Sequence, residues 1–147
     1  MNYHQVTENE FNTLVEIWER SVEQTHEFLR REDLITIKKE LPTYFPHLDV
    51  KVWTDQEKLI GFSGVAGNKL EMLFLDPRYI GQGYGKQIVR TLLEENGIQL
   101  VDVNEQNLSA RHFYQALGFE AYERSEVDDA RRPYPILHLQ IRADNLN

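Results

Sequence analysis

The chain has 147 residues, a net charge of −8 and no cysteine. Its hydrophobic (41%) and charged (27%) fractions are ordinary for a globular protein, and its length fits one domain spanning residues 1–147. The lack of cysteine excludes disulfides and thiolate metal sites and favours a cytoplasmic location. Nucleic-acid binding depends on lysine and arginine, and a membrane span needs about 20 apolar residues, so we expect neither kind of partner.

A short strand and two helices are predicted in the N-terminal third of the chain. Residues 2–6 are compatible with a strand. Thr7 and Glu10 then form a capping-box pattern, in which a hydroxyl and a carboxylate satisfy the first N–H groups of a helix, and apolar residues recur at helical spacing as far as Val22. A second helix is predicted over about residues 33–44.

The rest of the chain predicts six more strands and two more helices. In chain order these are three strands, a helix, a strand, a helix and two strands, over residues 49–54, 58–66, 69–75, 83–95, 98–103, 107–117, 119–127 and 136–142. A doubly wound nucleotide fold would alternate strands and helices from the start, whereas three strands run together here. The order therefore predicts an α/β (α+β) fold with a mixed sheet.

Three glycines alternate between a predicted strand and a predicted helix, at Gly81, Gly83 and Gly85, and Lys86 follows them. Backbone N–H groups at a helix N-terminus attract anions, and glycine lets the backbone approach a phosphate closely. The pattern is compatible with a bound phosphate or pyrophosphate, and also with a tight turn that binds nothing. The P-loop spacing is not met, and the dinucleotide fingerprint would need glycine where Lys86 stands.

Two motifs resemble those of the GNAT N-acetyltransferase superfamily. The stretch LFLDPRYIGQGYG resembles the pyrophosphate loop of that family, and NEQNLSARHFYQALGF, one helix and one strand later, resembles its next motif. The resemblance covers about residues 50–120. It implies a GNAT-type fold, with a mixed, mostly antiparallel central sheet of about seven strands flanked by about four helices. Nearer the ends, WxxSxxxTHxFL and RSExDD…PYP resemble a branch of small bacterial members, whose acceptors are mostly unassigned and include peptidyl lysine as one candidate.

The resemblance implies an enzyme that moves an acetyl group from acetyl-CoA to a primary amine by direct attack in a ternary complex. Small amines and peptidyl lysine stay open as acceptors, and a homodimer is compatible with the family. Asn107 would hydrogen-bond the pantetheine arm, and a backbone N–H near Leu73 or Phe74 would polarise the thioester carbonyl. The implied cofactor-binding residues are Leu73, Phe74, Leu75, Gly81, Gln82, Gly83, Tyr84, Gly85, Lys86 and Asn107.

Two positions depart from the family pattern. The first position of the pyrophosphate loop is usually glutamine or arginine, but it is Ile80 here, so one side-chain contact to the phosphates is missing. Arg78 is a candidate to replace that contact. Many relatives also carry a basic residue near residues 115–116 for the adenosine 3′-phosphate; it is absent here, and Arg111 is a candidate substitute.

Tyr114 and Glu71 are the residues that the resemblance implies for proton transfer. A lysine-like amine has an ordinary pKa of ~10.4 and arrives protonated, so it needs a base, for which Glu71 is the first candidate. Tyr114, with an ordinary pKa of ~10, keeps a proton for the leaving thiolate. Strict strand alternation would place Glu71 on the same face as Leu73. His26, whose ordinary pKa is near neutral, and Glu105 are the alternative bases.

The acceptor pocket is expected between the first two helices and the last hairpin. Some of its candidate residues also fit plainer roles, because Trp18 lies on the apolar face of a helix and Asp128 lies in a charged turn. The histidines have no metal-ligand spacing, so we expect no metal. The candidate acceptor-binding residues are Trp18, His26, Phe28, Asp128 and Tyr134.

Two other functions stay open at this point. A CoA-binding regulatory module without catalytic activity is one, because Ile80 weakens the match and the base is not fixed. It would bind coenzyme A without turnover. A dinucleotide-binding oxidoreductase is the other, and it would bind NADH without responding to coenzyme A. The run of three strands before the glycine turn argues against it.

Overall fold

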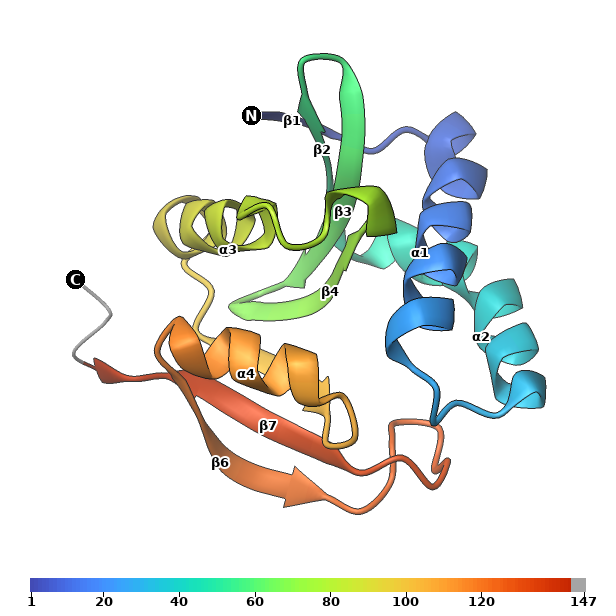
Figure 1. The fold of residues 1–147 in the computed structure, drawn as a ribbon, viewed down its shortest axis with the longest axis vertical. Helices are drawn as coiled ribbons and strands as arrows, with labels where there is room; N and C mark the ends of the chain where they lie inside the picture. The colour runs from blue at the N-terminus through green and yellow to red at the C-terminus, as the bar shows by residue number, and fades with distance from the viewer. Residues whose placement is uncertain (144–147) are drawn as a thin grey trace.

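Seven strands form one continuous sheet in the computed structural model, which describes residues 1–143 (Figure 1). Residues 144–147 of the predicted domain lie outside the described residues. The strands are β1 (Asn2–Gln5), β2 (Asp49–Asp55), β3 (Lys58–Ala66), β4 (Lys69–Leu75), β5 (Leu100–Asn104), β6 (Phe119–Ser125) and β7 (Ile136–Ile141). The helices are α1 (Phe11–Thr25), α2 (Arg31–Tyr44), α3 (Tyr84–Glu95) and α4 (Leu108–Ala116), with 3-10 turns η1 (Glu8–Glu10), η2 (Phe45–His47) and η3 (Pro77–Tyr79).

The strands are arranged in the order β1-β2-β3-β4-β5-β7-β6. Every neighbouring pair is antiparallel except β4 and β5, which are parallel. This arrangement confirms the predicted mixed, mostly antiparallel α/β sheet. It contradicts a doubly wound dinucleotide fold, whose sheet is mostly parallel.

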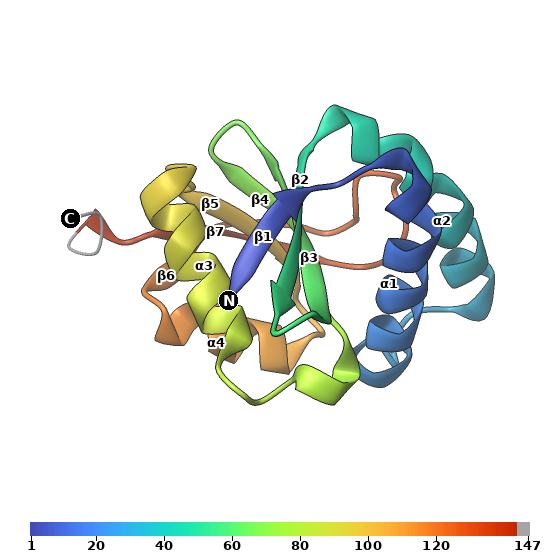
Figure 2. The same ribbon diagram turned by 90° about the horizontal axis from the view of Figure 1, so that it is seen from above.

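The helices cover the two faces of the sheet in pairs. Figures 1 and 2 show α1 and α2 on one face and α3 and α4 on the other. Each helix has an apolar stripe that packs on the sheet, so two buried clusters form. Leu14 and Phe62 belong to the cluster under α1 and α2, and Ile88 and Val101 belong to the cluster under α3 and α4.

The predicted capping box precedes α1 and is confirmed. The backbone N–H of Thr7 donates to Oε1 of Glu10 over 2.9 Å, within the 3-10 turn that leads into the helix. At its other end α1 stops at Thr25. His26 follows as the cap residue, and its N–H donates to the carbonyl of Val22 over 2.8 Å. The length of α1 thus brings His26 to the end of the sheet where β4 and β5 separate.

β4 and β5 pair only over their first two residues, Lys69–Leu70 and Leu100–Val101. β4 then continues to Leu75 and β5 to Asn104, and the described residues form no further pair between them. The strands therefore diverge towards their carboxyl ends. The edge of β4 at residues 73–75 is left with backbone groups that a ligand can pair with.

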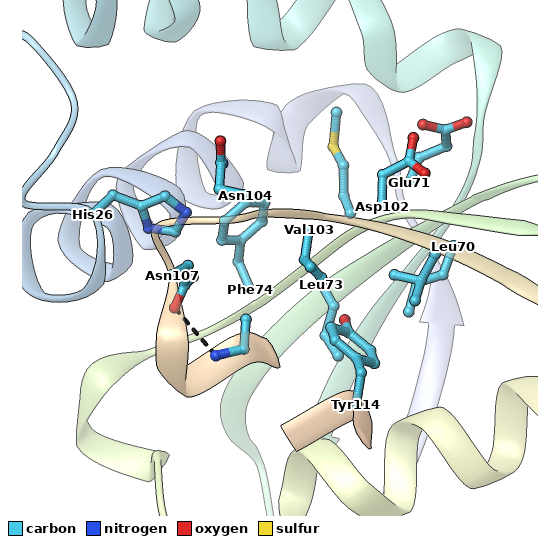
Figure 3. A pocket seen from close by; sticks show the side chains of 13 residues that line it. His26, Leu70, Glu71, Leu73, Phe74, Asp102, Val103, Asn104, Asn107 and Tyr114 are labelled. Carbon is cyan, nitrogen blue, oxygen red and sulfur yellow. Dashed lines mark hydrogen bonds between the residues drawn. The ribbon is translucent and has the colours of Figure 1, made fainter. Parts of the chain in front are cut away.

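A β-bulge in β4 determines the face on which Glu71 lies. Leu70 and Met72 pair with successive residues of β3, so Glu71 is an additional residue in the strand. Leu70 and Leu73 consequently pack towards α3 and α4, whereas Met72 packs towards α1 and α2. The predicted strict alternation is wrong at this point. Figure 3 shows the Glu71 carboxylate on the opposite side of the strand from Leu73.

Candidate active site

Two adjoining hollows open where β4 and β5 separate. The large hollow, of about 450 Å³, lies between the N-termini of α3 and α4, and the small hollow, of about 180 Å³, lies along β4 and β5 (Figure 3). They meet at a shared wall, so a group held in one can reach a group held in the other. The residues lining both are His26, Leu73, Phe74, Asn107, Ala110 and Tyr114.

The glycine loop forms one end of the large hollow. Gly81 and Gly83 line it with φ angles of 83° and 86°, in the left-handed region that favours glycine. A Cβ added at either position would meet no atom within 4 Å, so the space in front of the loop is open. Lys86 lines the hollow from the first turn of α3, where the helix dipole favours an anion. The loop therefore fits a phosphate group.

Gln82 and Tyr84 belong to this loop, but their side chains do not line the hollow. Gln82 donates its amide to the carbonyl of Arg78 over 3.1 Å. Tyr84 donates its hydroxyl to Oδ2 of Asp55 over 2.7 Å. These two side chains stabilise the loop. Only the backbone N–H groups of Gln82 and Tyr84 are then available to bind a ligand.

The two arginines considered for phosphate contacts lie elsewhere. Arg78 donates to Oδ2 of Asp76 over 2.9 Å and borders a separate hollow. Arg111 donates to a backbone carbonyl and borders a further hollow against β6 and β7. Ile80 itself lines the large hollow and is 45% exposed. Among residues 1–143, Lys86 is the one lysine or arginine that lines the large hollow.

Asn107 stands at the N-terminus of α4, between the two hollows. Its Oδ1 accepts the N–H of Ala110 over 3.1 Å and so caps the helix (Figure 3). Among residues 1–143, nothing accepts a hydrogen bond from its Nδ2. The amide nitrogen is therefore available to a ligand, as predicted for the pantetheine arm. Leu75 and Phe113 make much of the remaining wall apolar.

Tyr114 projects from α4 into the shared wall of the hollows. It is 6% exposed, and burial raises the pKa of its hydroxyl. No residue between 1 and 143 hydrogen-bonds this hydroxyl, which leaves it free to meet a ligand. The side chain therefore keeps its proton at neutral pH and can donate it.

Carboxylates dominate the small hollow. Glu71 and Asp102 line it, and Figure 3 shows their carboxylates close together on the side of the strands away from Tyr114. Burial raises the pKa of Glu71, the charge of Lys69 opposes this, and the charges of Asp102 and Asp129 raise it further. Thirteen residues of the described chain line the hollow, and none of them is lysine or arginine. The small hollow therefore favours a cationic group.

His26 lines both hollows, but burial makes it a weak base. Its Nδ1 lies 2.7 Å from Oγ1 of Thr25, and desolvation lowers its pKa to about 4. Burial raises the pKa of Glu71 instead, so burial makes Glu71 a better base and His26 a worse one. Glu105, the third candidate base, instead forms a salt bridge with Arg124 at 2.6 Å. The geometry favours Glu71.

Three of the predicted acceptor-binding residues have structural partners instead of lining a hollow. Trp18 is 3% exposed and belongs to the core under α1 and α2. The Tyr134 hydroxyl accepts the N–H of Arg30 over 3.0 Å and donates to Asp33, which ties the last hairpin to α2. The ring of Phe28 packs on that of Tyr134, with centroids 6.0 Å apart.

Asp128 also stabilises its own loop, while the charge of its neighbour Asp129 acts on the site. Oδ1 of Asp128 accepts the N–H groups of Ala130 and Arg132 over 2.9 and 2.7 Å. The charge of Asp129, by contrast, acts on Glu71. The acidic pair was visible in the sequence, but which of its members faces the site depends on the turn. Asp102 and Asn104, which line the small hollow, were also not predicted there; their place at the carboxyl end of a strand was the available signal.

Residues 1–143 contain neither a metal-binding group of side chains nor a membrane-spanning helix. No group of three or more His, Asp or Glu side chains in this part of the chain could hold a metal ion. None of the described helices is both long and apolar enough to cross a membrane.

The splayed pair β4 and β5, the glycine loop after β4 and the hollow lined by Glu71 and Asp102 fit a transferase that moves a group from a phosphate-bearing donor to an amine. The family model for the acetyltransferase (GNAT) domain matches residues 46–121, and the chain belongs to this family. It is an acetyltransferase of the GNAT type, with acetyl-CoA as its co-substrate. The features of the large hollow fit coenzyme A, with the glycine loop for the pyrophosphate and the open edge of β4 for pantetheine.

Individual relatives agree with the family assignment. The chain is 37% identical over 142 residues to the peptidyl-lysine N-acetyltransferase YjaB of Salmonella typhimurium, covering 95% of this chain and 97% of the relative. It is similar to the solution structure of apo YjaB from Escherichia coli, with a TM-score of 0.87 and 34% identity over 95% of each chain. The PaiA N-acetyltransferase of Thermoplasma acidophilum, solved with coenzyme A, shares the fold, with a TM-score of 0.66 and 20% identity over 95% of this chain and 98% of that one.

Proposed function

We propose that this enzyme acetylates the side-chain amine of lysine in a peptide or protein. The observation that carries the proposal is the meeting of the two hollows at Leu73 and Tyr114, one fitted to a phosphate-bearing apolar ligand and the other lined by carboxylates. A lysine side chain supplies the cation and the apolar stem that such a site accommodates. The names of the relatives, which are peptidyl-lysine acetyltransferases, support the same acceptor.

The large hollow orients the donor. When bound, acetyl-CoA supplies the acetyl group as an activated thioester. The N–H groups of residues 81–86 bind the pyrophosphate, and Nδ2 of Asn107 donates to the pantetheine arm. Successive N–H groups along a strand point in opposite directions, so one of Leu73 and Phe74 directs its N–H away from β3 and into the gap. That N–H polarises the thioester carbonyl.

Glu71 removes the proton that prevents the amine from attacking. The lysine enters the small hollow as an ammonium group, drawn by the carboxylates that line it. The raised pKa of Glu71 brings its proton affinity closer to that of the amine than an ordinary carboxylate would have. Glu71 accepts the proton directly or through one water molecule.

Tyr114 supplies the second proton. Its Oη lies in the wall shared by both hollows, next to the apolar space that holds the pantetheine arm. Because burial raises its pKa, the hydroxyl is protonated when the thiolate leaves, and Oη donates to the sulfur. Base and acid thus act from opposite sides of β4 (Figure 3).

Mass spectrometry of model peptides tests the proposed acceptor. The protein is incubated with acetyl-CoA and an N-terminally blocked peptide that contains one lysine, beside the same peptide with arginine in its place. We expect one acetyl group on the lysine peptide and none on the arginine peptide. Coenzyme A binding without any acetylation, over a panel of lysine peptides and small amines, would instead support the regulatory CoA-binding module.

The proposal also covers the setting of the reaction. We infer a single domain that acts in the cytoplasm, supported by the continuous sheet and by the absence of cysteine. The net charge of −8 supports a reaction without a nucleic-acid partner. Sedimentation of the purified protein, with and without coenzyme A, tests whether the family-compatible homodimer forms.

A further inference from the structure

Three side chains from neighbouring strands form a hydrogen-bonded chain that ends in the small hollow. Oγ of Ser125 lies 2.7 Å from Nε2 of His138, and Nδ1 of His138 lies 2.7 Å from Oδ1 of Asp102. A neutral imidazole with its proton on Nδ1 satisfies both bonds, donating to Asp102 and accepting from Ser125. Lys69 forms an ion pair with the other oxygen of Asp102. The Asp102 carboxylate is therefore held at both of its oxygens.

The order Ser-His-Asp is that of a hydrolytic triad, but the orientation is reversed. In such a triad the serine faces the substrate and the aspartate lies behind the histidine. Here Asp102 lines the small hollow, whereas Ser125 lies at the end of the edge strand β6 and lines neither hollow. The group presented to a substrate is thus the Asp102 carboxylate, and His138 and Ser125 lie behind it.

Charged groups from three segments of the chain act on Glu71, and Figure 3 shows Asp102 beside it. Lys69 comes from the same strand, Asp102 from β5 and Asp129 from the loop before β7. His26 and Tyr114 are the other titratable side chains lining the hollow. After burial and the opposing charge of Lys69, the negative charge of Asp102 is the next contribution to the raised pKa of Glu71.

We propose that His138, held by Ser125, is a positioning residue that fixes the Asp102 carboxylate beside Glu71, so that the two carboxylates together hold the acceptor ammonium while Glu71 receives its proton. This inference rests on the proposed function for its catalytic consequence. The His138–Asp102–Glu71 arrangement itself exists in the free protein and is tested there.

NMR titration of the free protein is the first test. In the wild type we expect His138 to carry its proton on Nδ1. Asp102→Asn removes a negative neighbour, so the titration midpoint of the Glu71 carboxyl carbon moves to lower pH. His138→Phe, which keeps a ring but loses both hydrogen bonds, moves the midpoint in the same direction by less. Glu120→Gln removes an equal charge from a residue that lines neither hollow, and leaves the midpoint unchanged.

Kinetics with the lysine peptide are the second test. His138→Phe raises KM for the peptide roughly fivefold, the size expected for about 1 kcal/mol of charge positioning, and leaves KM for acetyl-CoA unchanged. In His138→Asn the KM for the peptide returns most of the way to the wild-type value, because the asparagine amide can donate to Asp102 from the position of Nδ1.

The outcomes separate this inference from the proposed function. An unchanged Glu71 midpoint in His138→Phe overturns it, as does an equal peptide KM for His138→Phe and His138→Asn. If the wild type acetylates no lysine peptide, the proposed function fails, while the titration of the free protein still decides whether Asp102 is coupled to Glu71. Backbone spectra of each variant show whether it has folded, and His138→Leu, which also loses both hydrogen bonds, replaces His138→Phe if that variant does not fold.

Discussion

Tyr114, Glu71 and His26 are titratable side chains that line the small hollow, and burial favours the neutral form of each. For the two acids this means a raised pKa, and for His26 it means a pKa lowered to about 4. The same physical effect therefore keeps a proton on Tyr114, makes Glu71 a better base and makes His26 a worse one.

Tyr114→Phe removes the proposed acid and leaves the ring in place. We expect kcat to fall by roughly a hundredfold, within the usual range for general acid catalysis. Calorimetric titration with coenzyme A should give a dissociation constant within about twofold of the wild type, because the hydroxyl is not needed for binding. A Tyr114→Phe variant with wild-type kcat would assign the second proton to another group.

The pH dependence of kcat distinguishes Glu71 from His26. A carboxylate base works only when deprotonated, so kcat should fall as the pH is lowered through the raised pKa of Glu71. Glu71→Gln removes this acid limb and most of the activity. His26→Gln keeps the limb, because a group with a pKa of about 4 is already neutral over this range. If the limb disappeared in His26→Gln instead, histidine would be the base.

Helix ends and the glycine loop were predictable from the sequence because their signals are local. The helix predicted over residues 107–117 is α4, Leu108–Ala116, with Asn107 as its cap and a positive φ at Gly118 after it. The bulge at Glu71 and the insertion of β7 between β5 and β6 depend on pairing between distant segments, which leaves no pattern in a single strand. The partners of Trp18 and Tyr134 were unpredictable for the same reason.

Substitutions of two glycines at opposite ends of α3 distinguish an effect on ligand binding from an effect of backbone strain. Gly83 precedes the helix with a φ of 86°, and Gly97 follows it with a φ of 62°, both in open space. Gly83→Asp and Gly97→Asp should each destabilise the protein by roughly 1 kcal/mol, because an L-residue resists this conformation. Thermal unfolding measures that loss.

Of the two, Gly83→Asp alone should weaken coenzyme A binding, by at least about tenfold in the dissociation constant measured by calorimetry. Its carboxylate would stand in the open space where the pyrophosphate binds and repel it. Equal affinities for the two variants would mean that the phosphates bind elsewhere.

At the scale of the whole molecule, Asp76 connects the helix layer of α1 to the loop that follows β4. Its side chain is 3% exposed, and its Oδ2 accepts from Arg78 over 2.9 Å and from Arg20 over 3.0 Å. The hydrogen bonds from Arg78, against the effect of burial and with help from Arg20, lower the pKa of Asp76 to about 2. The carboxylate is thus charged throughout the neutral and mildly acidic range.

Asp76→Asn should lower the free energy of unfolding by roughly 1 to 3 kcal/mol at neutral pH, since two arginines lose a buried charged partner. The folded pKa lies below the ordinary value of 3.8, so this stabilisation is complete above about pH 4 and is lost as the pH falls towards 2. The free energies of unfolding of the wild type and of Asp76→Asn, measured with urea, should therefore become equal as the pH falls from about 4 towards 2. A difference in the free energy of unfolding that stayed constant down to about pH 2 would show that the charge of Asp76 is not what stabilises the fold.

In the proposed function, donor and acceptor are bound at the same time in the two adjoining hollows, and the amine attacks the thioester directly. Initial rates measured over a grid of acetyl-CoA and lysine-peptide concentrations test this most directly. A ternary complex predicts double-reciprocal lines that intersect. Parallel lines would indicate a covalent acetyl-enzyme and would contradict direct transfer.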